Sequence, residues 1–242
     1  MIPASRARYL AWRAFGFPER IVVGLLTGER LLIRRLPAHD LSVAHEVFVQ
    51  KVYRPEAIAN GRDVSRIVDV GSNVGYTLVY FGLRYPEAAL VAFEPHPTHV
   101  ELLKRNVALN NLSARVRIHA AAAGDRKGEA RLSDEGTCST LVNGEALSAI
   151  SVPIIDFFDA VGTGDIDLLK MDAEGAEYPI LMDERFPNLR TRMLVVEWHA
   201  TPERPDADVL ISARLEQLGW HLKEGPKDQQ PGHRTGILWG CR

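Results

Sequence analysis

The chain has 242 residues, of which 46% are hydrophobic and 25% are charged, and its formal net charge is -2. This composition is ordinary for a globular protein with one sizeable core, and the near-neutral charge offers no basic field for nucleic acid. The two cysteines, Cys138 and Cys241, exclude a disulfide framework and a cysteine-based metal cluster. No apolar run approaches the roughly 20 residues of a membrane span, so we expect a cytoplasmic protein without stable membrane insertion.

The first 60 residues predict an extension that precedes the main pattern of the chain. Residues 4–15 predict a short amphipathic helix, which either caps the domain edge or docks on a membrane surface or a partner. Residues 20–35 predict a β-hairpin that turns near Gly28, and residues 41–59 predict a second helix. We therefore treat residues 1–60 as a small helix and hairpin extension.

From residue 66 onward, strand and helix patterns alternate, which predicts a core domain over residues 61–242. Serial βαβ units of this kind form a mostly parallel α/β sheet with helices on both faces. Apolar, β-branched runs predict its strands at residues 67–70, 89–93, 115–120, 166–171, 193–197, 220–223 and 237–239. Helices are expected at residues 76–85, 98–110, 178–183 and 207–218. Other segments are short extended pieces at residues 128–132, 139–142 and 151–155, and a polar loop at residues 225–236.

The first core strand ends in a glycine turn that reads Asp69-Val-Gly71-Ser72-Asn73-Val-Gly75. Dinucleotide-binding turns read G-x-G-x-x-G, whereas these two glycines are four residues apart and an acid precedes the first by two. That acid suits a ligand with an ammonium group, such as the methionine part of S-adenosylmethionine, better than a pyrophosphate. Free N–H groups of the turn can bind the carboxylate of the same ligand. The alternative is a plain connection between a strand and a helix.

The second core strand ends at Glu94 and Pro95, and Glu94 follows Asp69 by 25 positions. An acid at this place in a nucleotide-binding sheet can accept both hydroxyls of a ribose. The alternatives are a solvated loop glutamate and a helix-capping acid. In combination with the glycine turn, the pattern favours the ribose role.

Two further strands end in clusters of titratable side chains. The fourth core strand leads into Asp172, Glu174 and Glu177, three carboxylates within six residues. Substrates of open α/β sheets bind at this edge, so these acids are candidates for catalysis, although acids also favour a helix N-terminus. The fifth strand ends in Glu197 and His199, where the histidine is either a general base or a structural residue.

Six motifs of the chain resemble, in order, the motifs of the FkbM family of class I S-adenosylmethionine-dependent methyltransferases. They are Asp69–Thr77, Phe93–Pro97, Asn106–Asn110, Gly136–Leu141, Lys170–Glu177 and Val196–His199. The resemblance implies a seven-stranded Rossmann-like sheet. It also implies methyl transfer, mostly to a hydroxyl of a sugar, a glycolipid or a polyketide-type natural product. It covers about residues 40–242 and does not explain the first 40.

The resemblance further implies roles for single residues around S-adenosylmethionine. The expected cofactor-binding residues are Asp69, Gly71, Ser72, Asn73, Gly75, Glu94, Pro95, Ala122 and Asp125. Those of the glycine turn would surround the methionine part, and Glu94 would hold the ribose. Ala122 and Asp125 would lie near the adenine. Many members of the family have alanine where Ser72 stands.

We expect a methyl group to move to an acceptor oxygen by in-line displacement, with a nearby base that removes the hydroxyl proton. Asp172 and His199 are the candidates for this base, and Glu174 and Glu197 would orient substrate hydroxyls. A polar loop around Thr137, Ser139 and Thr140 would close over the site. The expected partner is therefore a small-molecule or carbohydrate acceptor, and a homo-oligomer stays open.

Three alternatives stay open at the level of sequence. Carboxylates clustered with His199 can hold a divalent metal through oxygen ligands, although we assign none. The chain can also be a non-catalytic S-adenosylmethionine-binding protein that assembles a biosynthetic complex, but such a protein has little use for acids at the substrate edge. An NAD-dependent oxidoreductase is disfavoured because the chain lacks G-x-G-x-x-G.

Overall fold

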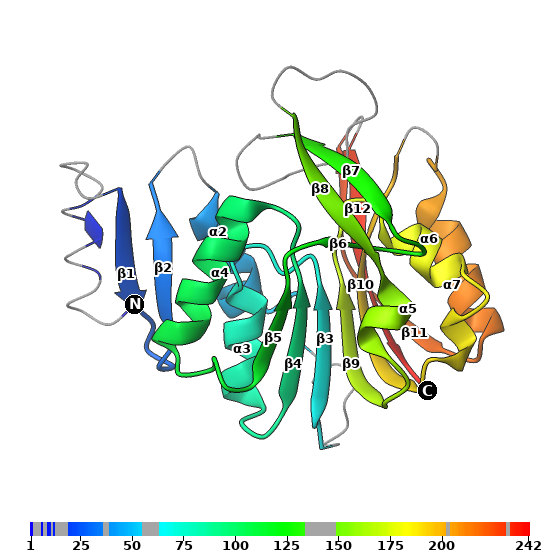
Figure 1. Ribbon diagram of the computed structural model, residues 1–242, viewed down its shortest axis with the longest axis horizontal. Helices are drawn as coiled ribbons and strands as arrows, with labels where there is room; N and C mark the ends of the chain where they lie inside the picture. The colour runs from blue at the N-terminus through cyan, green and yellow to red at the C-terminus, as the bar shows by residue number, and fades with distance from the viewer. Residues whose placement is uncertain are drawn as a thin grey trace.

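A seven-stranded sheet forms the centre of the computed structural model (Figure 1). The model describes residues 1, 6, 9, 10, 12, 19–35, 39–54, 63–133, 149–201, 204–230 and 233–242. From edge to edge the strands are β11 (His221–Gln230), β12 (His233–Cys241), β10 (Thr191–His199), β9 (Ile166–Met171), β3 (Arg66–Val70), β4 (Ala89–Phe93) and β5 (Val116–His119). Neighbouring strands from β10 to β5 are parallel, and β12 is antiparallel to both β10 and β11. The predicted mostly parallel, seven-stranded sheet is confirmed.

Both faces of the sheet are apolar, because the central strands consist mostly of consecutive apolar residues and successive side chains point to opposite faces. Ile67 packs on one face and Val68 on the other, and Leu168 and Leu169 divide in the same way. The helices are α3 (Tyr76–Arg84), α4 (Pro97–Leu109), α5 (Phe157–Val161), α6 (Glu177–Met182) and α7 (Ala207–Gln217). Helices α3 and α4 pack on the first face, and α5, α6 and α7 pack on the second (Figure 1).

A second sheet of three short strands lies at the carboxyl edge of the main sheet. It consists of β6 (Ala122–Gly124), β8 (Ala149–Asp156) and β7 (Gly128–Ser133), in that order. Sequence patterns predicted extended segments here but did not assign them to a separate sheet. The residues 134–148 between β7 and β8 lie outside the described residues, and with them the predicted closing loop around Thr137, Ser139 and Thr140.

The described part of the extension contains a hairpin and a short helical stretch. Strands β1 (Arg20–Gly24) and β2 (Arg30–Arg34) pair antiparallel, as predicted. Helix α2 (Asp40–His45) continues as the π-helical turn η1 (Glu46–Gln50). The helix predicted over residues 41–59 is wrong at residues 51–54, because Lys51 adopts a left-handed conformation with φ of 54° that ends η1, and residues 55–59 lie outside the described residues.

Two predictions about the extension fall wholly or partly outside the described residues. Of the helix predicted over residues 4–15, the structure describes only residues 6, 9, 10 and 12, which are helical, and Trp12 packs into the core of the first face. The boundary predicted at residues 60 and 61 lies outside the described residues, so the division into 1–60 and 61–242 stays a prediction. Within the described residues, no helix combines the length and apolar character that a membrane crossing requires.

The polar loop predicted at residues 225–236 is wrong, because most of it continues the last two strands. The ladder of β11 and β12 runs from the pair His221 and Cys241 to the pair Gln230 and His233. The register shifts between Glu224 and Lys227. The outer part of this hairpin extends beyond β10, so its polar residues do not need to enter the core.

Asn106 of α4 and Asn110, the C-cap of this helix, hold the β1–β2 hairpin against the core. The Arg30 N–H donates to Asn110 Oδ1 at 2.9 Å, and Asn110 Nδ2 donates to the Arg30 carbonyl at 2.8 Å. The Leu32 N–H donates to Asn106 Oδ1 at 2.7 Å, and Asn106 Nδ2 donates to the Val74 carbonyl at 2.8 Å. These side chains make the hydrogen bonds that a neighbouring strand would make with β2. Asn106 also joins β2 to the glycine turn.

We predict that Asn106→Ala destabilises the fold by about 2 to 4 kcal/mol, because it leaves the Leu32 N–H and the Val74 carbonyl without their buried partner. Urea unfolding measures this loss. Lys104→Ala, at an exposed position of the same helix, is the matched control and should stay within about 0.5 kcal/mol of wild type. Equal stability of the two variants would contradict the role of Asn106.

Candidate active site

The carboxyl ends of β4, β3, β9 and β10 meet at one edge of the sheet and line two adjoining cavities. The first, of about 90 Å³, lies against the ends of β3 and β4 and the small sheet. The second, of about 560 Å³, lies between the ends of β9 and β10, the extension and the C-terminal hairpin. Gly71, Asn73, Asp172 and Glu174 line both, so the two cavities meet at the glycine turn. Ligands of open α/β sheets bind at such an edge.

Gly71 lies directly against the end of β9. Its φ is 75°, and a Cβ atom at this position would lie 1.6 Å from the Asp172 carbonyl oxygen. The N–H groups of Gly71 and Ser72 both donate to the Phe93 carbonyl at 3.0 Å, and the Asp172 N–H donates to the Val70 carbonyl at 3.0 Å. A residue with a side chain would separate these strand ends, which explains the first glycine of the turn.

The rest of the turn is also closed by internal hydrogen bonds. The Asn73 N–H donates to Glu94 Oε2 at 2.8 Å, the Val74 N–H to Asn73 Oδ1 at 2.8 Å, and the Gly75 N–H to the Ser72 carbonyl at 2.8 Å. The expectation that N–H groups of this turn are free for a ligand carboxylate is therefore wrong. Neighbouring carbonyl and side-chain oxygens already accept from all of them.

Asp69 lines neither cavity but lies in the interior beneath the turn. Its carboxylate is fully buried, pairs with Lys170 Nζ at 3.1 Å and accepts a hydrogen bond from the Thr77 hydroxyl. Lys170 Nζ also donates to the Gly71 carbonyl at 2.7 Å and lies 3.5 Å from Asp172 Oδ2. The predicted contact of Asp69 with a ligand ammonium group is replaced by this contact with a protein ammonium group.

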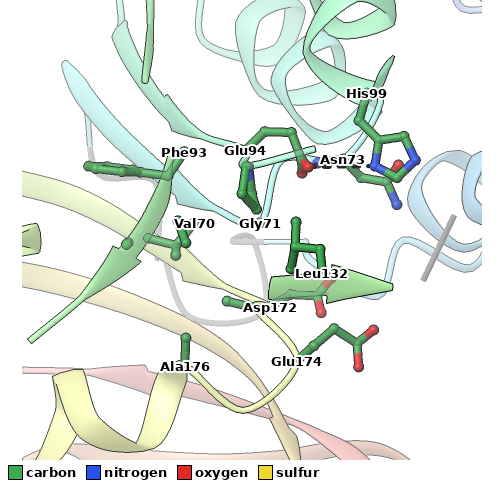
Figure 2. Close-up of a pocket in the computed structure, with 14 residues that line it drawn as sticks. Val70, Gly71, Asn73, Phe93, Glu94, His99, Leu132, Asp172, Glu174 and Ala176 are labelled. Carbon is green, nitrogen blue, oxygen red and sulfur yellow. Dashed lines mark hydrogen bonds and ion pairs between the residues drawn. The ribbon is translucent and has the colours of Figure 1, made fainter. Parts of the chain in front are cut away.

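Figure 2 shows the first cavity, with Glu94 and Asn73 on one side and Asp172, Glu174 and Ala176 on the other. Of the predicted cofactor-binding residues, those that line it are Gly71, Asn73, Glu94, Pro95 and Ala122. Ser72 lines only the second cavity. Like Asp69, Gly75 and Asp125 line neither cavity.

The last two have other roles in the fold. Gly75 begins α3 with φ of 84° and lies close to Leu103, so it serves the packing of α3 on α4. The backbone carbonyl of Asp125 accepts a hydrogen bond from the Arg185 guanidinium. Two lining residues with no predicted role in the site are Phe93 and His99. Phe93 was identified only as the end of a strand and the start of a family motif, and His99 only as a helical residue.

Acidic side chains and a histidine dominate the second cavity. His199 Nδ1 lies 3.3 Å from Glu177 Oε1, and His199 Nε2 lies 3.6 Å from Glu174 Oε2 and 3.9 Å from Asp172 Oδ1. Burial lowers the pKa of His199, but the hydrogen bond and charge of Glu177 and the charges of Asp172 and Glu174 outweigh it and raise that pKa to about 10. His199 is therefore an imidazolium at neutral pH and cannot act there as the predicted general base.

The contact between His199 and Glu177 also affects the alternative that this acidic cluster binds a divalent metal. Asp172, Glu177 and His199 present ligand-type atoms within 4.8 Å of one another. The Glu177 carboxylate accepts from the backbone N–H groups of Ala173 and Gly175, and its third partner is the protonated His199. A metal ion would have to displace the proton of His199 in order to bind there. The metal alternative therefore stays a prediction, and no ligands are assigned.

Tyr53, a residue of the extension, lies between two of the carboxyl groups. Its hydroxyl oxygen is 2.9 Å from Asp172 Oδ2 and 2.6 Å from Glu197 Oε2. Burial and the negative charge of Asp172 raise the pKa of Glu197 to about 7, although the hydrogen bond with Tyr53 and the charges of His199 and Lys170 lower it. Sequence reasoning missed Tyr53, because nothing in residues 41–59 indicates contact with strands more than 100 residues away.

The fold is that of the Rossmann-like methyltransferases, which typically have a sheet with this strand order and a glycine turn after its first core strand. Solved structures of similar fold are TYW2 from Pyrococcus horikoshii in complex with MeSAdo and TYW2 from M. jannaschii in complex with AdoMet. The first has a TM-score of 0.55 at 12% identity and covers 98% of this chain and 82% of the other. The second has a TM-score of 0.50 at 11% identity, with 92% and 85% covered.

The family follows from the sequence itself. The family model of the methyltransferase FkbM domain matches residues 69–219, and the chain belongs to this methyltransferase family. It is similar to the methyltransferase sdnD of Sordaria araneosa, with 28% identity over 224 residues that cover 77% of this chain and 84% of the relative. Methyltransferase 1 of Beauveria bassiana is 36% identical over 91 residues, which cover 36% of this chain and 35% of the relative.

The protonated state of His199 predicts a pH dependence of stability. Its pKa is about 10 in the folded protein and about 6.5 in the unfolded chain, so its ion pairs stabilise the fold fully below about pH 6.5. This contribution disappears as the pH rises through about 10. The difference in unfolding free energy between wild type and His199→Gln should therefore shrink over that interval, as measured by urea unfolding. His221→Gln controls for loss of an exposed histidine, and a difference that stays constant would contradict the assignment.

Proposed function

We propose that this methyltransferase uses S-adenosylmethionine and transfers its methyl group to a hydroxyl oxygen of a sugar-like or polyketide-type acceptor. The observation that carries the proposal is the junction of the two cavities at Gly71, Asn73, Asp172 and Glu174. One cavity has the residues that suit a nucleoside, and the other has the polar groups that suit a hydroxylated acceptor. The AdoMet and MeSAdo complexes of similar fold support this choice of cofactor.

The side chains of the first cavity fit the nucleoside part of this cofactor. Val70, Phe93, Ala122 and Leu132 offer an apolar lining for adenine. The Glu94 carboxylate is held by the N–H groups of Asn73 and His96, both at 2.8 Å. A carboxylate has about four lone-pair sites, so Glu94 retains capacity for ribose hydroxyls.

The junction carries negative charge where the cationic part of the cofactor would lie. Asp172 and Glu174 line both cavities, and opposite charges attract more strongly in a partly buried site than in water. When bound, S-adenosylmethionine supplies a methyl group that its sulfonium already makes electrophilic. The protein then has to position the acceptor hydroxyl and accept its proton.

Asp172 is the best placed group to accept that proton. Its Oδ2 atom is held by Tyr53 at 2.9 Å, while Oδ1 faces His199 at 3.9 Å. Asp172 would accept the proton of the acceptor hydroxyl as its oxygen takes the methyl group, while the methyl–sulfur bond of the cofactor would break and leave a neutral thioether. His199, as a cation, holds the surrounding carboxylates, and Glu174 and Glu197 orient acceptor hydroxyls.

The lining of the second cavity favours a neutral, hydroxyl-rich acceptor. The carboxyl groups of Glu46, Asp172, Glu174 and Glu197 can accept hydrogen bonds from hydroxyl groups, and the ionised ones among them repel an anionic acceptor. Apolar side chains of Val43, Val47, Val52 and Ile237 on the extension and hairpin offer surface for a hydrocarbon portion. This combination suits a sugar or a hydroxylated natural product.

Calorimetry with S-adenosylhomocysteine and with NAD tests the cofactor. We predict binding of the first and none of the second, and about tenfold or greater loss of affinity in Glu94→Gln through lost charge-assisted hydrogen bonds. Glu87→Gln, at an exposed position before β4, is the matched control and should bind like wild type. Binding of NAD alone would overturn the proposal.

A methyl-transfer screen tests the reaction. Transfer of labelled methyl from S-adenosylmethionine to hydroxylated acceptors should fall by about 10²-fold or more in Asp172→Asn, as expected for loss of a general base. Affinity for S-adenosylhomocysteine should change little, because the first cavity keeps its other residues. A cofactor-binding protein without turnover on any acceptor would instead support the assembly alternative.

A further inference from the structure

Among the residues that the extension contributes to the second cavity, Tyr53 contacts two carboxyl groups of the core domain. Lys51 ends η1 in a left-handed conformation, and the chain then turns so that Tyr53 lies against β9 and β10. The Tyr53 side chain is buried, and its ring lies over Lys170 Nζ at 5.1 Å. Tyr53 precedes residues 69–219 that match the family model, so its contribution comes from outside the matched region.

The hydrogen-bond distances around Tyr53 determine how many protons Tyr53, Asp172 and Glu197 share. Its hydroxyl oxygen is within hydrogen-bond distance of Asp172 Oδ2 and of Glu197 Oε2, at 2.9 and 2.6 Å. A phenol has one proton to donate and an ionised carboxylate can only accept. Tyr53 therefore donates to one carboxyl group and accepts from the other, which has to be protonated.

The surrounding charges decide which carboxyl group keeps the proton. Lys170 lies 3.5 Å and His199 lies 3.9 Å from the Asp172 carboxylate, so this group has two counter-charges beside it. In the part of the chain that the structure describes, no cation lies within ion-pair distance of Glu197. The titratable and charged groups that line this cavity are Glu46, Tyr53, Tyr76, Lys170, Asp172, Glu174, Glu197, His199, Lys227 and Asp228.

We propose that Tyr53 is a positioning residue that accepts a hydrogen bond from a protonated Glu197 and donates its own to an ionised Asp172. This proposal rests on the proposed methyl transfer and names the residue that orients its proton acceptor. Tyr53 holds Oδ2 of Asp172, so Oδ1 is the atom left to receive the proton of the acceptor hydroxyl. The raised pKa of Glu197, about 7, agrees with a proton on that residue near neutral pH.

The arrangement gives the extension a role in the reaction. The glycine turn and the end of β9 belong to the family region, whereas the group that orients Asp172 comes from the segment after η1. Methyl transfer releases one proton to Asp172, and Glu197, already protonated, does not compete for it. Loss of the Tyr53 hydroxyl should therefore impair turnover and alter the carboxyl titration, with little effect on cofactor affinity.

Carbon-13 NMR of the cofactor-free protein, labelled at the aspartate and glutamate carboxyl carbons, tests the proton directly. Wild type should show one carboxyl group that titrates near pH 7. This titration should be absent in Glu197→Gln, whereas in Asp172→Asn it should remain but move to lower pH, because the negative charge that raises the pKa of Glu197 is removed. In Tyr53→Phe its midpoint should move by at least about 0.5 pH unit, because both carboxyl groups lose a partner. The proposal is wrong if no carboxyl group titrates near pH 7 or if Tyr53→Phe leaves the midpoint in place.

Tyr76→Phe is the matched control, since its buried hydroxyl donates to the Leu32 carbonyl at 2.8 Å and contacts neither carboxyl group. It should lose a similar amount of stability and leave the titration unchanged. In turnover assays, Tyr53→Phe should lower kcat by about tenfold or more with KM for S-adenosylmethionine within about threefold. If wild type methylates no acceptor, the proposed function fails, but the NMR titration still determines whether Glu197 carries the proton.

Discussion

One buried cation, Lys170, determines how the strand ends of this sheet come together. Its ammonium group lies within 3.1 Å of Asp69 Oδ1, 2.7 Å of the Gly71 carbonyl and 3.5 Å of Asp172 Oδ2, and the side chain is only 1% exposed. Burial lowers its pKa, but Asp69 and Asp172 outweigh this effect and raise it, so Lys170 stays charged. A buried ion pair adds little net stability but is costly to break. Its value here is that the turn after β3 and the end of β9 can have only one relative position.

That position explains why the two cavities meet where they do. Gly71 can approach the Asp172 carbonyl because it has no side chain, and the contact brings the glycine turn beside the acidic end of β9. Around this point the charges alternate, with Lys170 and His199 placed between carboxylates. Asp172 has Lys170, His199 and Tyr53 beside it, while Glu197 lies farther from a cation. Asn106 of α4 binds both the β1–β2 hairpin of the extension and the glycine turn. Tyr53, from the other end of the extension, lines the second cavity.

Sequence patterns predicted the features that depend on neighbours along the chain. The apolar strands, the glycine turn and Glu94 at the next strand end are of this kind, and each has the expected place in the fold. They could not predict partners across the fold. Asp69 has the spacing of a ligand-binding acid, yet a lysine 101 positions later occupies it, and Tyr53 reaches Asp172 across 119 positions. His199 was a reasonable base by type alone, and only the three carboxylates around it reveal that it is a cation.

The pairing of Lys170 with Asp69 holds the turn against β9, and a double-mutant cycle on the free energy of unfolding tests this pairing most directly. Lys170→Met should cost about 3 to 5 kcal/mol, because it leaves the Asp69 carboxylate buried without a counter-charge. Adding Asp69→Asn removes that charge and keeps an acceptor for the Thr77 hydroxyl, so the double variant should be more stable than Lys170→Met alone by more than about 1 kcal/mol. Strict additivity of the two single changes would contradict the account.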